Sequence, residues 1–291
     1  MSLENHVIKN KVLNSKDRYC VFGNPIKHSK SPLLHALFAS QTTQDLAYTA
    51  QCVDIDNFSS AATSFFGGGG KGLNITVPFK HDAYSFASSL TERAIRAGAV
   101  NTLFINGHNV VVGDNTDGIG LVADITLHLK WQLKDMRILI MGAGGSVRGI
   151  LEPMIKESPH SITIVNRTKE KAQQLANDFS DIFSISATSY PELNNDENLC
   201  SFDFIINASS ASLAGELPAL PNHIINKYTY CYDLMYAKEL TPFLLWAKAK
   251  GSCFISDGLG MLVCQGAESF LIWRGVKPKT AEVIGRLRAL L

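Results

Sequence analysis

The chain has 291 residues and a formal net charge of +1, and 46% of its residues are hydrophobic and 18% charged. This balance is typical of a globular protein and excludes an intrinsically disordered chain. The small net charge favours neither a nucleic-acid partner nor a membrane-surface partner, and no apolar run approaches the ~20 residues of a membrane span. A typical domain has roughly 150 residues, so the length favours two domains.

The cysteines and histidines predict neither disulfides nor a metal site. The six cysteines are scattered and include no CxxC pair, which is typical of reduced core thiols in a cytoplasmic protein. His28 and His35 lie near each other in the sequence, but no third ligand follows at a suitable spacing, so we expect no metal. The polar N-terminus lacks the apolar stretch of a signal peptide.

The first half alternates strand-like and helix-like segments after about eighteen polar residues, which we expect to form a loose extension. Ser31 is a suitable N-cap and Pro32 suits a first helical position, so a helix is expected to start there. The pair Asn106-Gly107 predicts a two-residue hairpin turn. The expected strands are 19–23, 47–53, 72–77, 100–105 and 109–113, and the further helices are 56–66 and 81–90.

A second unit is expected to start near Gly118. Its expected strands are 137–141, 161–165, 202–207 and 228–233, and its expected helices are 119–130, one that opens after the first of these strands, and one from Lys169. Strands that alternate with helices predict a parallel, doubly wound sheet. The tail, 257–291, has the pattern of two helices, the second at about 279–291, and we expect it to return to the first unit.

A glycine-rich turn follows the strand 137–141 and opens the next helix. It consists of Gly142, Ala143, Gly144, Gly145 and Ser146. A pyrophosphate binds well at such a helix N-terminus, because glycines allow a tight turn and a close approach of the backbone. Val147 replaces the last glycine of the strict G-x-G-x-x-G pattern, so an ordinary glycine-rich turn remains the alternative interpretation.

The next strand ends in Asn166, Arg167 and Thr168, where NAD-specific folds usually carry a carboxylate for the ribose 2′-hydroxyl. Arg167 would instead attract a 2′-phosphate, and Lys171 adds charge. A solvated basic helix start is the alternative, but basic residues at a helix N-terminus oppose the macrodipole, and a bound anion explains them better. The sequence therefore favours NADP.

Polar clusters follow or end several strands of the first half. They span 23–32, 74–80, 97–102 and 113–118. Ligands of open α/β sheets bind beyond the carboxyl ends of the strands. Each cluster alone is more simply explained by turns and caps, but four together indicate a site for a small polyhydroxylated acid.

The chain resembles the shikimate dehydrogenase family over nearly all of 19–291. The matching strings are GNPIKHSKSP at 23–32, NITVPFK at 74–80, AGAVNT at 97–102, GDNTDG at 113–118, YDLMY at 232–236 and DGLGMLV at 257–263. Thr241-Pro242 and Gln265 match as well. The resemblance implies a cytoplasmic enzyme of chorismate and aromatic amino-acid biosynthesis, which reversibly reduces 3-dehydroshikimate to shikimate with NADPH.

The resemblance also implies individual roles. Lys80 and Asp117 are the implied catalytic pair. The residues implied to bind substrate are Ser29, Ser31, Thr76, Lys80, Asn101, Asp117, Tyr236 and Gln265. The two serines are implied to bind the substrate carboxylate through their hydroxyls. The residues implied to bind NADP are Glu92, Gly142, Ala143, Gly144, Gly145, Ser146, Asn166, Arg167, Thr168, Lys171, Leu234 and Gly258. Two positions depart from the family pattern: Lys171 stands where arginine is frequent, and Ser212 stands where glycine is usual.

The predicted fold is α/β with two domains: an α/β substrate-binding domain, 1–117 plus 258–291, and a Rossmann-like NADP-binding domain, 118–257. The chain would cross between them near Gly118 and Gly258, which are plausible hinges. We expect small-molecule partners only, and a monomer or a homodimer.

Two other functions stay open from the sequence. One is a quinate/shikimate dehydrogenase with relaxed substrate or cofactor choice, against which the two serines at the carboxylate pocket argue by leaving less room. The other is a nucleotide-binding regulatory protein without chemistry, which would have no need of the Lys80 and Asp117 pair.

Overall fold

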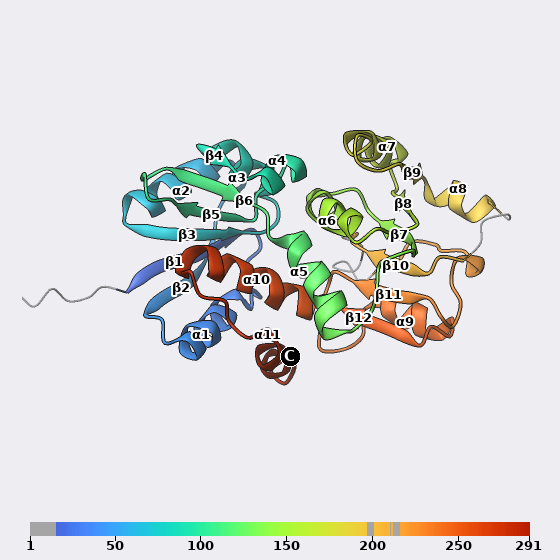
Figure 1. Ribbon diagram of the computed structural model, residues 1–291. Helices are drawn as coiled ribbons and strands as arrows, with labels where there is room; N and C mark the ends of the chain where they lie inside the picture. The colour runs from blue at the N-terminus through green and yellow to red at the C-terminus, as the bar shows by residue number, and fades with distance from the viewer. Residues whose placement is uncertain (1–15, 197–200, 210, 212–215) are drawn as a thin grey trace, which may run out of the picture.

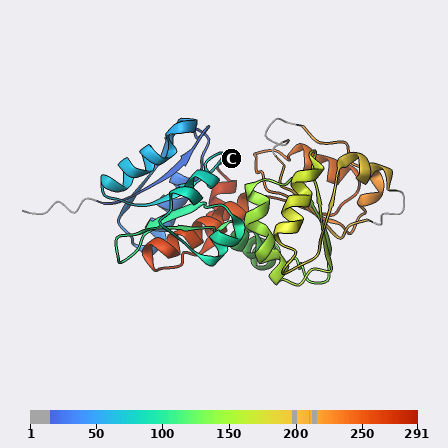
Figure 2. The same cartoon turned by 90° about the horizontal axis from the view of Figure 1, so that it is seen from above.

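The computed structural model describes residues 16–196, 201–209, 211 and 216–291. These residues form two α/β units, each built on a six-stranded sheet, with helix α5 between them (Figures 1 and 2). The predicted α/β fold class with a Rossmann-like second unit is confirmed. The first fifteen residues of the expected N-terminal extension lie outside the described part, and Asp17 and Arg18 belong to the first strand rather than to a loose extension.

The first sheet is mixed, in the order β2-β1-β3-β5-β6-β4. Its strands are β1 (Asp17–Gly23), β2 (Leu46–Cys52), β3 (Gly70–Ile75), β4 (Ser89–Leu90), β5 (Thr102–Ile105) and β6 (Val111–Asp114). The helices of this part are α1 (Ser31–Thr42), η1 (Ile55–Asn57), α2 (Phe58–Gly67), α3 (Lys80–Phe86) and α4 (Glu92–Ala97). β1 pairs in parallel with β2 and β3, so the carboxyl ends of these three strands lie on one edge.

The second sheet is parallel throughout, in the order β12-β11-β10-β7-β8-β9. Its strands are β7 (Arg137–Met141), β8 (Ser161–Val165), β9 (Ile185–Thr188), β10 (Phe204–Asn207), β11 (Tyr230–Asp233) and β12 (Phe254–Asp257). The helices along it are α6 (Gly145–Lys156), α7 (Lys169–Asp178), α8 (Tyr190–Asn195), η4 (Asn222–Ile224) and α9 (Pro242–Ala249). The strand order reverses between β7 and β10, and dinucleotides bind at such a switch point.

The C-terminal tail packs on the first unit. It forms α10 (Leu259–Arg274) and α11 (Thr280–Arg288). One hydrophobic cluster joins Leu34 and Phe38 of α1 to Val263 and Phe270 of α10. The Trp273 indole Nε1 donates a 3.2 Å hydrogen bond to the carbonyl oxygen of Leu103 in β5.

The crossing helix α5 (Asp117–Ala123) continues into one π-helical turn, η2 (Asp124–His128), where the sequence predicted a single helix 119–130. Asp124 is buried there and accepts a 2.7 Å hydrogen bond from the Tyr232 hydroxyl at the end of β11. Burial raises the pKa of the Asp124 carboxyl, and the Tyr232 hydrogen bond opposes that shift. A Cβ on Gly260 of α10 would meet the Asp124 carboxyl oxygen at 1.9 Å, so the crossing helix, β11 and α10 meet tightly here.

Three local predictions are corrected by the structure. The N-cap of α1 is Lys30, and Ser31 is the first helical residue and makes no side-chain cap. The loop of the β5–β6 hairpin spans 106–110, because the Asn106 Oδ1 accepts hydrogen bonds from the backbone N–H groups of His108 and Val110 and stabilises a wider turn. The expected helix 81–90 ends at Phe86, and its last two residues form β4 beside β6.

Candidate active site

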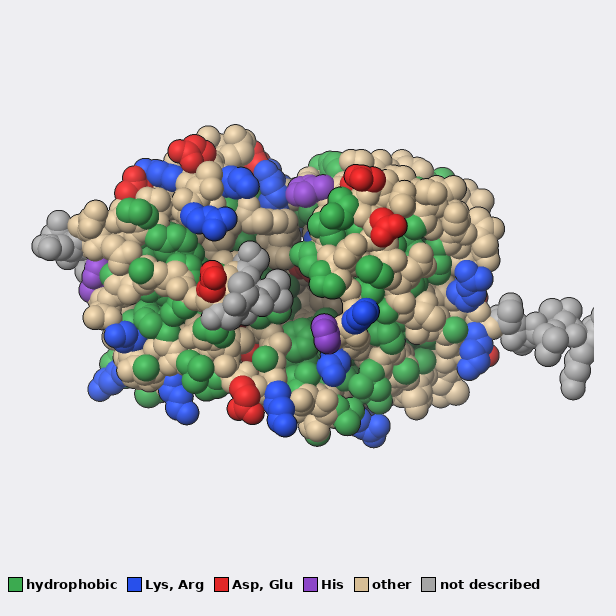
Figure 3. All heavy atoms as spheres, turned by 180° about the vertical axis from the view of Figure 1, so that it is seen from behind, with side chains coloured by type: hydrophobic (Ala, Val, Ile, Leu, Met, Phe, Trp, Pro, Cys, Tyr) green, Lys and Arg blue, Asp and Glu red, His purple; other side chains and the backbone are tan. Residues whose placement is uncertain are grey.

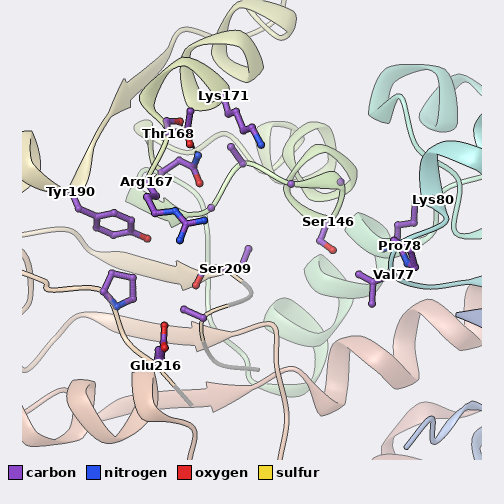
Figure 4. Close-up of a pocket in the computed structure, with 18 of the residues that line it drawn as sticks. Val77, Pro78, Lys80, Ser146, Arg167, Thr168, Lys171, Tyr190, Ser209 and Glu216 are labelled. Atoms are coloured by element: carbon purple, nitrogen blue, oxygen red, sulfur yellow. Dashed lines mark hydrogen bonds between the residues drawn. The ribbon is translucent and has the colours of Figure 1, made fainter. Parts of the chain in front are cut away.

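A cleft of about 760 Å³ lies between the two units and is lined from both sides (Figures 3 and 4). The first unit contributes Val77, Pro78, Lys80 and His81. The second unit contributes the residues Gly142, Ala143, Gly144, Gly145, Ser146, Asn166, Arg167, Thr168, Lys171, Tyr190, Ala208, Ser209, Ala211, Glu216, Leu217 and Pro218. Nine residues predicted to bind NADP thus share one cavity with the predicted catalytic lysine.

The glycine-rich turn after β7 has a shape that only glycine supports at its first position. Gly142 has a φ of +112°, and a Cβ there would lie 3.1 Å from the carbonyl oxygen of Ala208. α6 begins directly behind the turn, and its N-cap, Gly144, offers no side-chain cap to the first N–H groups. Those groups are available to an anion, so the turn fits a pyrophosphate. Val147, in place of the last glycine of the motif, is fully buried in the core.

The residues after β8 line a second part of the same cleft. Figure 4 shows Arg167, Thr168 and Lys171 on one wall of the cleft, and Arg167 and Thr168 are exposed there. The Asn166 side chain donates a 2.8 Å hydrogen bond to the carbonyl oxygen of Thr168 and stabilises this bend. The wall combines two cations with hydroxyl and amide groups, which suits a phosphate monoester.

Lys80 and Asp117 form an ion pair at the other end of the cleft. The Lys80 Nζ donates to the Asp117 Oδ2 at 2.5 Å, and the two side chains are 13% and 8% exposed. Lys80 begins α3 and Asp117 begins α5, so each is presented at the start of a helix. The second Asp117 oxygen, Oδ1, accepts a 2.8 Å hydrogen bond from the Asn101 Nδ2. The carboxylate is thereby fixed from two sides.

Gln265 of α10 reaches the same network from the tail. Its Oε1 lies 3.4 Å from the Asn101 Nδ2 and accepts a 3.3 Å hydrogen bond from the Thr116 hydroxyl. Four residues predicted from separate segments of the sequence therefore meet in one polar cluster. They are Lys80, Asn101, Asp117 and Gln265.

Ser29 and Ser31, the two serines predicted to bind the substrate carboxylate, lie at the start of α1. The Ser31 backbone N–H donates a 3.3 Å hydrogen bond to the Ser29 hydroxyl, which brings the two serines together. Tyr48 interacts with the Ser31 side chain, and its hydroxyl donates to the Asn74 Oδ1 at 2.7 Å. Thr76 follows β3 on the same edge of the sheet, where its N–H donates to the carbonyl oxygen of Phe22 at 3.0 Å.

Leu234 and Gly258 are neighbours at the carboxyl ends of β11 and β12. The Gly258 N–H donates to the carbonyl oxygen of Met235 at 3.0 Å, and a Cβ on Gly258 would lie 2.1 Å from the carbonyl oxygen of Leu234. Only glycine allows this approach. Tyr236 packs against the cluster of α1, α10 and α11, and burial, with a smaller effect of Asp257, raises its pKa.

Glu92 is placed less favourably than the other predicted residues. It is the first residue of α4, it is exposed, and it is not among the residues that line the cleft. Its predicted role therefore gains no support from its position. Ser212, which with Lys171 departs from the family pattern, lies outside the described residues.

Several residues of the cleft were not predicted from the sequence. Ser209 follows β10 at the same edge of the sheet as the glycine turn, so its position after a strand could have predicted it as a cleft residue. Tyr190 begins α8 after β9, two elements that the sequence did not reveal, and burial raises its pKa to about 12. His81 follows Lys80 and had no distinguishing pattern.

The described residues offer neither a metal-binding cluster nor a membrane-spanning helix. They contain no group of three or more His, Cys, Asp or Glu side chains that could hold a metal ion. In the same part of the chain, no helix has both the length and the apolar character that a membrane crossing requires.

The fold and the site define a two-domain, dinucleotide-binding α/β protein with a lysine–aspartate pair in its cleft. Three family models match the chain: the shikimate dehydrogenase substrate binding domain at 21–103, shikimate / quinate 5-dehydrogenase at 124–215 and the shikimate 5′-dehydrogenase C-terminal domain at 258–288. The chain belongs to the shikimate dehydrogenase family.

Relatives and solved structures agree with this assignment. The shikimate dehydrogenase (NADP(+)) of Cellvibrio japonicus is 51% identical over 275 residues, which cover 94% of this chain and 98% of that protein. The crystal structure of an Ael1 enzyme from Pseudomonas putida is 43% identical, with a TM-score of 0.86 and coverage of 94% and 98%. Shikimate 5-dehydrogenase from Thermus thermophilus, in complex with NADP(H) and shikimate, is 27% identical, with a TM-score of 0.82 and coverage of 94% and 100%.

Proposed function

We propose that this protein catalyses the reversible, NADPH-dependent reduction of 3-dehydroshikimate to shikimate. The observation that carries the proposal is the convergence of Lys80, Asn101, Asp117 and Gln265 in one network beside a dinucleotide-binding cleft. The NADP-dependent names of the relatives and the NADP(H) and shikimate in the Thermus structure support the choice of cofactor and substrate.

The proposed division of labour follows the two sheets. Residues 1–117 with 258–291 bind the substrate, and residues 118–257 bind NADP(H). The packing of α10 on β5, through Trp273, supports the assignment of the tail to the first domain. The protein would act in the cytoplasm, as a monomer or a homodimer, on small molecules.

NADP(H), when bound, supplies the hydride for reduction and takes it up in oxidation. The chain must then handle one proton at the reacting oxygen. In reduction, the Lys80 Nζ donates a proton to the oxygen that gains negative charge, and its own charge stabilises that oxygen beforehand. In oxidation, the Lys80 amine accepts the hydroxyl proton, so this direction speeds up as the pH rises.

Asp117 orients the lysine and accepts a hydrogen bond from a substrate hydroxyl. Its Oδ2 holds the Lys80 Nζ while its Oδ1 is held by Asn101, so the carboxylate cannot rotate freely. Asn101 and Gln265 bind further ring hydroxyls. A network with this many fixed donors and acceptors suits a polyhydroxylated ring, because an analogue lacking one hydroxyl would leave a buried polar group unpaired.

Ser29 and Ser31 bind the substrate carboxylate through their hydroxyls, Thr76 binds a ring hydroxyl, and Tyr236 also reaches the substrate. The Ser31 backbone N–H donates a 3.3 Å hydrogen bond to the Ser29 hydroxyl, which supports a shared role for this short segment. Quinate carries one more hydroxyl on the carbon that bears the carboxylate, and a pocket closed by two serines leaves less room for it. Shikimate is therefore the preferred substrate over quinate.

The glycine turn and α6 hold the pyrophosphate of the cofactor. Asn166, Arg167, Thr168 and Lys171 hold its 2′-phosphate, and the carbonyl groups near Leu234 and Gly258 contact the nicotinamide end. The absence of a side-chain cap on α6 supports the first assignment, and the exposure of Arg167 supports the second. Glu92 has the weakest support.

The test is a four-way activity measurement that follows the nicotinamide absorbance with shikimate or quinate and with NADP⁺ or NAD⁺. We expect shikimate with NADP⁺ to give the highest kcat/KM and quinate a much lower one. Equal or better turnover of quinate would support the relaxed quinate/shikimate enzyme instead. No turnover in any combination, with NADP⁺ still bound, would support the regulatory protein.

A further inference from the structure

His81 is a cleft residue to which the proposed reaction gives no role. It is the second residue of α3 and follows Lys80 directly, so one turn of α3 presents both side chains to the cleft. The His81 side chain is exposed, and no hydrogen bond or ion pair within the described part of the chain engages its ring nitrogens. Its surroundings therefore decide what it can bind.

The nearest feature across the cleft is the start of α6. A Cβ built on Gly145, the first residue of α6, would point into the cleft and meet the His81 Nε2 at 3.9 Å. A Cβ built on Gly144 would meet nothing within 4 Å among the described residues. The space in front of the α6 N-terminus is open, and His81 forms its wall on the side of the first domain.

An anion would bind most favourably in this open space. The uncapped N–H groups of α6 point toward it, and the helix dipole favours negative charge there. A phosphate oxygen placed at the mouth of α6 would come within hydrogen-bonding range of an imidazole N–H on the opposite wall.

We propose that His81 is a further cofactor-binding residue, which donates a hydrogen bond from the substrate domain to the pyrophosphate of NADP(H). This inference rests on the proposed use of NADP(H). It gives the pyrophosphate a ligand from each domain, whereas Arg167 and Lys171 hold the 2′-phosphate from the second domain alone. Cofactor binding would thus draw the two walls of the cleft together at Lys80.

The test compares two ligands by titration calorimetry. NADP⁺ contains the pyrophosphate, and adenosine 2′-monophosphate retains the adenosine and the 2′-phosphate but lacks it. The variants are His81→Ala, His81→Gln, which keeps a side-chain N–H donor, and Arg167→Ala. Asp82→Asn, at the next exposed position of α3, is the matched control, since Asp82 does not line the cleft.

We expect His81→Ala to weaken NADP⁺ binding roughly tenfold, the lower end of the loss for one hydrogen bond to a charged group, because the His81 side chain is exposed. His81→Gln should recover part of this loss. Neither change should affect adenosine 2′-monophosphate, whereas Arg167→Ala should weaken both ligands.

NADP⁺ affinity of His81→Ala within about twofold of wild type would overturn the inference and leave the proposed function standing. An equal loss for both ligands, or a lowered Tm that His81→Gln does not restore, would also overturn it, because the effect would then come from the fold. If the wild-type protein failed to bind NADP⁺, the proposed function would fail first and the inference with it.

Discussion

Arg167 lies in the segment that follows β8, where an NAD-specific domain would present a carboxylate to the ribose. A carboxylate repels a 2′-phosphate, whereas the planar guanidinium matches the phosphate oxygens in charge and geometry. The side chain is exposed on the cleft wall, so it is free to meet a ligand (Figure 4). We propose that the choice between the two cofactors depends mainly on this residue.

Replacing Arg167 with Asp should reverse the cofactor preference. The loss of a charge-assisted hydrogen bond costs about 1.5–3 kcal/mol, which is roughly a 10- to 150-fold rise in KM for NADP⁺, and the new carboxylate adds repulsion. KM for NAD⁺ should change little. Steady-state kinetics with both cofactors check this, with Lys227→Asp, a basic residue that does not line the cleft, as the control. An unchanged KM ratio in Arg167→Asp would mean that the 2′-phosphate binds elsewhere.

At the residue scale, the sequence predicted residues that the fold does bring together. Lys80, Asn101, Asp117 and Gln265 come from four segments and meet through hydrogen bonds. It did not predict Tyr190 or His81, because whether a side chain faces a cleft depends on the rotation and position of its helix. That information lies in tertiary packing, not in a local pattern.

At the element scale, α1 packs through a buried histidine. The His35 ring stacks on Tyr48 of β2 at a centroid distance of 4.1 Å and is 1% exposed. Burial lowers the pKa of His35 to about 3, a shift that the neighbouring Asn74 opposes. The folded protein therefore holds His35 in its neutral form.

The stability of the wild-type protein should fall as the pH falls through the window between about 6.5 and 3. The unfolded chain takes up a proton on His35 below its ordinary pKa, and the folded chain does not until near pH 3. The contribution is fully present above that window and changes by at most about 1.4 kcal/mol per pH unit inside it.

His35→Phe should show a shallower loss of unfolding free energy over the same pH range, because the titrating group is absent. Denaturant unfolding at several pH values measures this. His108→Phe, at the exposed tip of the β5–β6 hairpin, should keep the wild-type slope. A slope for His35→Phe equal to that of wild type would show that other groups cause the acid sensitivity.

Most elements followed from the sequence, and those that did not have physical reasons. β7 has a continuous apolar run after Arg137, and β8 consists mostly of β-branched residues, so both strands were placed with the correct bounds. β4 has two residues and exists through its pairing with β6, so it has no pattern of its own. α8 begins with a capping box of Ser189 and Glu192. This signal was not used, because the sequence did not predict β9, the strand that precedes it.

At the scale of the whole molecule, the cleft requires both units in one position. Besides α5 and the α10 helix, a further contact joins them: the Arg96 Nη2 of α4 lies 2.5 Å from the Asp181 Oδ1, and the guanidinium lies 4.8 Å from the centre of the Phe179 ring. Asp124, Tyr232 and Gly260 hold the crossing between the units. These contacts set the distance between the predicted proton donor and the cofactor.

We propose that Lys80, presented by one domain, handles the proton while the cofactor bound to the other exchanges the hydride. Lys80→Ala tests it most directly in steady-state kinetics with shikimate and NADP⁺, with a melting curve and NADP⁺ affinity from the same sample. We expect a kcat lowered by roughly 10²–10⁴-fold, with Tm and NADP⁺ affinity near those of wild type. A kcat within about threefold of wild type, with a raised KM for shikimate and a lowered Tm, would contradict it, because Lys80 would then only form a salt bridge in the cleft wall.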